Sequence, residues 1–84
     1  MKTQCWIDLF DLPTFRGERR RFFGPTVVDA SVIGGDAAHA VSLRVGNEAA
    51  LRIVMSDGDQ TTLSGGEAIE SLDAARVTRL EVKG

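Results

Sequence analysis

Four segments of the chain alternate between apolar and polar residues with the period of a β-strand. They span residues 5–10, 40–45, 50–55 and 77–82. Successive side chains of a strand point to opposite faces, so this pattern predicts four strands that each bury one face. The apolar residues on these predicted inner faces form the expected core: Ile7, Leu9, Val41, Leu43, Val45, Leu51, Ile53, Leu80 and Val82.

Shorter strands and turns fill the chain between these four segments. Residues 19–23, 26–28 and 60–63 are further expected strands. Glycine, proline, asparagine and aspartate mark turns at residues 24–25, 34–36, 46–47, 56–59 and 65–66. Short strands separated by regular turn signals indicate an all-β sandwich or barrel.

One segment, residues 66–76, competes as a helix. Ile69, Leu72 and Arg76 would lie along a single face of a helix there. We expect at most one or two helical turns in this segment.

An internal repeat relates the two halves of the chain. Three short segments of the first half recur in the same order in the second, namely residues 7–10, 22–25 and 43–45 at 51–54, 63–66 and 80–82. A unit of about 40 residues is too small to bury a core alone. The two units are therefore expected to pack on one another.

Composition narrows the class of protein further. With 84 residues, one domain is expected, and the net charge of −2 gives no overall attraction to nucleic acid or to an anionic membrane. The single cysteine, Cys5, excludes an intrachain disulfide. No apolar segment has the length of a signal peptide or a membrane span, so we expect a cytoplasmic location.

The most specific motif follows the first predicted strand. Phe10 is followed by a second aromatic residue, Phe15, and then by Gly17, while Ser42 stands at the start of a later strand. A folded hairpin needs a positive φ at the glycine, and aromatic rings stacked over the hairpin shield it from water.

These four residues resemble the Greek-key hairpin of the βγ-crystallin superfamily in its microbial form. The resemblance implies an all-β sandwich of two Greek-key motifs with pseudo-twofold symmetry, in which the serine ties back to the hairpin. The motifs would span residues 5–45 and 49–83 of a single domain, 1–84. The second motif departs from the pattern, because Val54 replaces the first aromatic residue and Arg79 replaces the serine.

Many microbial members of this superfamily bind calcium through two Asn/Asp residues, two variable residues, a Ser/Thr and a Ser. Here the aligned stretches are 37–42 and 74–79, and alanines occupy both acidic pairs. The hydroxyl position is Val41 in one stretch and Thr78 in the other. Since calcium needs hard oxygen ligands, the resemblance implies a degenerate calcium site. Asp36, Asp73 and Thr78 remain the weak candidate ligands.

No catalytic or zinc constellation can be assembled from the remaining residues. His39 is the only histidine, Cys5 faces the predicted core, and residues 57–59 suit a hairpin turn better than a cation site. The one charge cluster contains Arg16, Arg19, Arg20 and Arg21, interleaved with phenylalanines. Such a cluster is either the solvated face of a strand or an interaction surface.

The expected function is therefore that of a non-enzymatic structural or interaction module without a cofactor or strong calcium binding. Two alternatives stay open: a calcium-binding module, and a small protein-binding or inhibitor domain that acts through the arginine-rich hairpin. The expected partner is an unidentified protein or a second copy of the chain. We do not expect nucleic acid or a membrane to be the partner.

Overall fold

Strands make up most of the computed structural model, which describes residues 5–33 and 40–83. The strands are β1 (Trp6–Leu12), β2 (Arg16–Phe23), β3 (Thr26–Asp29), β4 (Ala40–Val45), β5 (Ala50–Met55), β6 (Gln60–Leu63), β7 (Ala68–Asp73) and β8 (Val77–Lys83). A short helix, α1 (Ala30–Ile33), follows β3, and a 3₁₀ turn, η1 (Ala74–Arg76), precedes β8. Within the described part of the chain, no helix has both the length and the hydropathy needed to cross a membrane.

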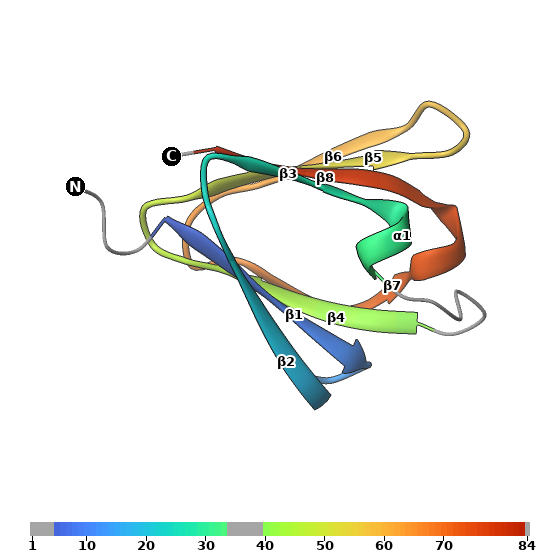
Figure 1. Ribbon diagram of the computed structural model, residues 1–84, viewed down its shortest axis with the longest axis horizontal. Coiled ribbons are helices and arrows are strands. Elements are labelled where there is room, and N and C mark those ends of the chain that lie inside the picture. The colour runs from blue at the N-terminus through green and yellow to red at the C-terminus, as the bar shows by residue number, and fades with distance from the viewer. Residues whose placement is uncertain (1–4, 34–39, 84) are drawn as a thin grey trace.

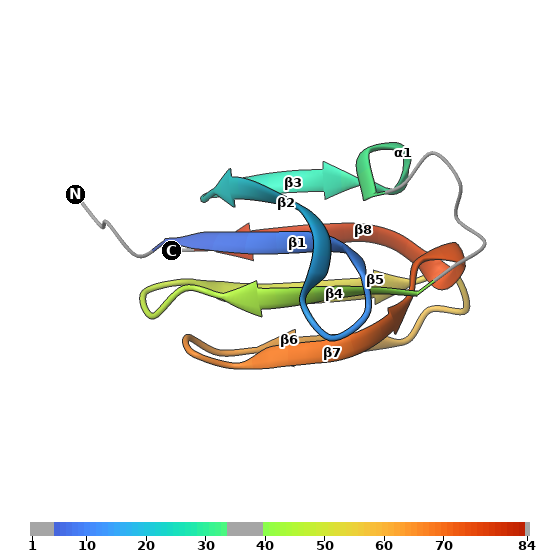
Figure 2. The ribbon, with the colours of Figure 1, turned by 90° about the horizontal axis from the view of Figure 1, so that it is seen from below.

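The strands form two antiparallel sheets of four, which lie face to face as two layers (Figure 1). The strand order is β2-β1-β4-β7 in the first sheet and β3-β8-β5-β6 in the second. Figure 2 shows the two sheets stacked one behind the other, with the β1–β2 loop reaching across β4 toward β7. The prediction of an all-β sandwich is therefore confirmed.

Each half of the chain lends one strand to the sheet of the other half. β3 pairs with β8 in the second sheet, and β7 pairs with β4 in the first. The rest of each sheet comes from one half, so the two sheets have the same order when the halves are exchanged. This exchange gives the sandwich the pseudo-twofold symmetry that the repeat predicts.

Leu43 and Leu80 hold equivalent positions in the two halves. Leu43 lies opposite Leu9 on the neighbouring strand, and Leu80 lies opposite Ile53 in the same way. Both leucines are fully buried. Every residue of the predicted core is buried between the sheets, so the alternating pattern identified the inner faces correctly.

The segment with helical spacing is mostly a strand. Residues 68–73 form β7, and the helical part is limited to the single turn of η1. The register shifts between Val41 and Leu43, so that two residues of β7, Glu70 and Ser71, lie opposite one residue of β4. Because of this bulge, Ile69 and Leu72 both face inward although they are three positions apart. Their spacing in the sequence therefore resembles that of a helix face.

Helix α1 closes one end of the sandwich beside β3 and β8 (Figure 1). Ile33 is buried in the core. The guanidinium of Arg20 donates hydrogen bonds to the carbonyl oxygens of Val32 and Ile33, at the end of this helix. Arg20 therefore satisfies carbonyl groups that a helix end otherwise leaves without partners.

Candidate functional site

The β1–β2 connection is a folded hairpin with three residues in the left-handed region. Thr14, Phe15 and Gly17 have φ angles of 58°, 60° and 83°. A Cβ on Gly17 would lie 3.2 Å from Cγ of Leu12, so both the backbone angle and the space favour glycine. The amide of Thr14 donates to the carbonyl of Glu70 at 2.8 Å, which anchors the hairpin tip on β7.

Ser42 ties this hairpin to the middle of the first sheet. Its hydroxyl accepts a hydrogen bond from the amide of Phe15 at 2.8 Å and donates one to the carbonyl of Leu12 at 2.7 Å. Ser42 itself is fully buried. The ring of Phe15 meets that of Phe10 edge to face, with centroids 5.7 Å apart. The four residues of the hairpin motif thus lie together as one structural unit.

The second hairpin, between β5 and β6, is held by polar contacts in place of aromatic rings. The Asp57 carboxylate accepts a bond from the amide of Asp59 at 3.0 Å and one from the Arg76 guanidinium at 2.6 Å. The amide of Ser56 donates to the carbonyl of Arg76 at 2.7 Å. The hydrogen bond from Asp59 lowers the pKa of Asp57 most, and the neighbouring Arg76 lowers it further.

Arg79, which stands where the first motif has Ser42, makes no comparable tie. Its guanidinium donates to the Glu81 carboxylate at 2.7 Å, on its own strand. Arg52 lies 3.6 Å from the same carboxylate across the sheet. The hydrogen bond from Arg79 is the largest cause that lowers the pKa of Glu81.

Two of the three candidate calcium ligands, Asp73 and Thr78, lie among the described residues. The Asp73 carboxylate accepts a hydrogen bond from the amide of Ala75 at 3.1 Å and so caps η1. Thr78 is exposed on β8, while Asp36 lies outside the described residues together with His39. Among residues 5–33 and 40–83, no three His, Cys, Asp or Glu side chains gather in a way that could hold a metal ion.

The four arginines that form a possible interaction surface in the sequence do not lie together in the structure. Arg21 makes two hydrogen bonds to the buried carboxylate of Asp8, at 2.7 and 2.9 Å, and Arg19 lies 3.8 Å from it. The hydrogen bond to Asp8 raises the pKa of Arg21. Arg20 points the other way, toward α1 and Asp11. Arg16 is exposed at the start of β2, so the cluster in the sequence is not one surface.

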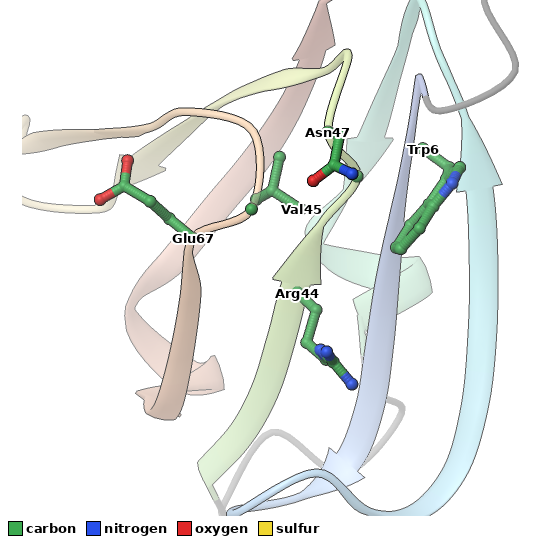
Figure 3. Close-up of a pocket in the computed structure, with 7 residues that line it drawn as sticks. Trp6, Arg44, Val45, Asn47 and Glu67 are labelled. Carbon is green, nitrogen blue, oxygen red and sulfur yellow. The ribbon is translucent and has the colours of Figure 1, made fainter.

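A shallow hollow on the first sheet brings together residues that the sequence did not single out. Its volume is about 280 Å³, and Trp6, Arg44, Val45, Gly46, Asn47, Gly66 and Glu67 line it. Figure 3 shows Arg44 turned toward β1 and the Glu67 carboxylate pointing away from both Arg44 and Trp6. Glu67 instead accepts a hydrogen bond from the amide of Ser64 at 2.6 Å.

The alternation of polar and apolar residues indicates which side chains face outward here, but not which of them lie next to one another. Asp8 and Arg44 lie directly opposite one another on β1 and β4. They face outward, because Leu9 and Leu43 beside them face the core. Only the pairing of the two strands places Arg44 near Trp6, which is two positions before Asp8.

Cys5 lies in the core beside Gly24. It is 4% exposed, and a Cβ on Gly24 would approach its sulfur to 2.9 Å. This position makes Cys5 a small apolar packing residue.

Comparison with known proteins rests on structure, because no family model and no curated protein sequence matches the chain. A solved structure described as "Evolution of the eye lens beta-gamma-crystallin domain fold" is similar, with a TM-score of 0.72 and 19% identity. The match covers 96% of this chain and 87% of that one. Together with the exchanged strands and the folded hairpin tied by Ser42, this similarity identifies the fold of the chain as that of the βγ-crystallin domain.

Proposed function

We propose that the chain is a non-enzymatic structural or interaction module of the βγ-crystallin type, held together by packing and without strong calcium binding. The observation that supports this proposal is the conformation of the second calcium stretch, residues 74–79. Its first residues form the turn η1, and the nearest carboxylate, Asp73, is engaged in capping that turn.

An arginine within this stretch, Arg76, supports the same proposal. The Arg76 guanidinium lies 2.6 Å from the Asp57 carboxylate and joins the stretch to the β5–β6 hairpin. A calcium ion needs six to eight oxygen ligands, most of its affinity coming from carboxylates. In this region, one carboxylate is paired with an arginine and another with a backbone amide, so a tight site would need both to be released.

The competing function is a calcium module that uses Asp36, Asp73 and Thr78. A ligand that binds only the folded state adds about 2.7 kcal/mol of stability at a hundredfold excess over Kd. For a domain of this size, that corresponds to a rise in Tm of roughly 10 °C or more. Thermal unfolding in millimolar calcium and in chelator therefore separates the two functions.

We expect no resolvable difference in Tm between calcium and chelator. The matched variant is Asp73→Asn, which keeps a capping oxygen but removes the charge. A calcium-dependent rise in the wild type that Asp73→Asn abolishes would establish the calcium module in place of the structural one.

A further inference from the structure

The strongest unexplained feature is the guanidinium of Arg44. Within the described residues, no carboxylate lies within ion-pair distance of it. Asp8 lies opposite Arg44 on the next strand, yet both of its oxygens are bound by Arg21. The guanidinium carbon of Arg44 lies 5.7 Å from the centroid of the Phe15 ring, a cation–π contact that uses none of its N–H groups. Arg44 therefore keeps its hydrogen-bond donors available at the edge of the hollow.

The outer face of the second sheet carries an arginine that does have a carboxylate partner. Arg52 lies opposite Glu81 on the outer face of that sheet, as Asp8 lies opposite Arg44 on the first. Glu81 is 3.6 Å from Arg52 and 2.7 Å from Arg79. The pseudo-twofold symmetry thus supplies a matched outer face whose arginines have a carboxylate partner.

The walls of the hollow suit a group that is charged at one end and apolar at the other. Trp6 forms one side, and the guanidinium of Arg21 stacks on its ring at 3.9 Å. Phe23 lies opposite Trp6 on β2, outside the lining of the hollow, and is 64% exposed. Tryptophan and arginine are the residues most enriched at the energetic centres of protein interfaces.

The size of the hollow also restricts its occupant. Sites for drug-sized ligands measure about 300–1,000 Å³. A volume of about 280 Å³ lies below this range, so the hollow is suited to one or two side chains better than to a cofactor.

We propose that this hollow binds an acidic peptide segment of a partner protein, with one Asp or Glu carboxylate on Arg44 and an adjacent apolar residue against the part of Trp6 that lines the hollow. A carboxylate accepts two parallel hydrogen bonds from a guanidinium, and such charge-assisted pairs are stronger than neutral ones. This inference deepens the interaction role proposed above and is independent of the calcium measurement, so either can fail alone.

The test is an array of short peptides with a central glutamate and varied apolar, neutral and charged neighbours, each paired with the same peptide carrying glutamine. We expect a subset with apolar neighbours to bind at least about tenfold more tightly with glutamate than with glutamine. Trp6 is the only tryptophan, so its fluorescence gives the affinity of each peptide in solution.

Three variants locate the binding site. Arg44→Gln should abolish the preference for glutamate, whereas Arg52→Gln, on the matched face of the second sheet, should retain it. Both residues lie on outer faces, and circular dichroism would verify that both variants keep the fold. Arg44→Lys should retain part of the preference, since it keeps the charge but loses the two parallel hydrogen bonds.

Three results would overturn the proposal. The first is an array without any preference for glutamate over glutamine, and the second is a preference that survives Arg44→Gln. The third is Arg44-dependent binding of a short oligothymidylate that is tighter than that of every peptide, which would make the partner a nucleic acid.

Discussion

Replacing Ser42 by alanine tests whether one hydroxyl holds the folded hairpin. The change removes two hydrogen bonds, at 2.7 and 2.8 Å, and leaves the carbonyl of Leu12 and the amide of Phe15 without these partners. Each hydrogen bond contributes about 1 kcal/mol, and a buried group left unsatisfied costs about 1–3 kcal/mol. Both partner groups are only partly buried, so we expect a total loss of about 2–4 kcal/mol in the free energy of unfolding.

Fluorescence of Trp6 during urea unfolding measures this loss, and thermal melts should show a fall in Tm of roughly 10 °C or more. Ser71→Ala is the matched control, because Ser71 is an exposed serine on the adjacent strand β7 and should change stability by less than about 0.5 kcal/mol. Equal melting of the Ser42 and Ser71 variants would refute the role of the tie.

A double-mutant cycle with Phe15→Ala sharpens the same test. Phe15 is held over Phe10 by a backbone whose φ of 60° is unfavourable for a residue with a Cβ. If Ser42 maintains that conformation, the two substitutions together should cost less than the sum of the single ones, by about 0.5–3 kcal/mol. Strict additivity would show that the aromatic pair forms without the tie.

Three further substitutions test other parts of the fold. Gly65→Ala would place a Cβ 2.2 Å from the carbonyl oxygen of Asn47, so we expect a loss of about 1–3 kcal/mol in urea unfolding. Arg21→Gln would remove the main partner of the buried Asp8 carboxylate and should cost about 1–3 kcal/mol, measured in the same way. Asp57→Asn should flatten the acid side of the stability profile: the folded-state pKa of Asp57 is lowered, so its contribution is present above about pH 4 and is lost as the pH falls through that pKa.

Each of these substitutions has a control at a neighbouring position that leaves the tested interaction in place. Ser64→Ala adds no clash beside Gly65, Arg16→Gln removes an exposed arginine of the same strand, and Asp59→Asn leaves the amide that binds Asp57 in place. If a control variant and its test variant lose the same stability, or show the same pH profile, the contact in question is not the cause.

The sequence predicted most of the sandwich because the core face of each inner strand carries apolar residues at every second position. In β1, β4 and β5 the alternation of side chains is uninterrupted at the core positions, and in β8 it holds from Leu80 onward, after a register shift beside Thr78. All nine expected core residues are buried. β7 was missed as a strand because the bulge opposite Ser42 spaces Ile69 and Leu72 by three. Local periodicity cannot reveal an irregularity that only the neighbouring strand defines.

The polar surface was less predictable for a related reason. Arg19, Arg20 and Arg21 are consecutive in the sequence, but the alternation of β2 sends Arg20 to the helix end and the other two to Asp8. The hollow beside Arg44 joins residues from β1, β4 and the loops after β4 and β6. No single segment carries that combination, so it depends on which strands become neighbours.

The exchange of β3 and β7 between the sheets has a consequence for how the chain folds. β3 pairs with β8, about fifty positions further along the chain, so the first motif cannot complete its pairing until the last strand is in place. Distant pairings require large loops to close before any contact compensates for the lost entropy, which slows folding. Because each sheet needs one strand from the other half to be complete, the slowest-exchanging amides should be distributed over both motifs and open together.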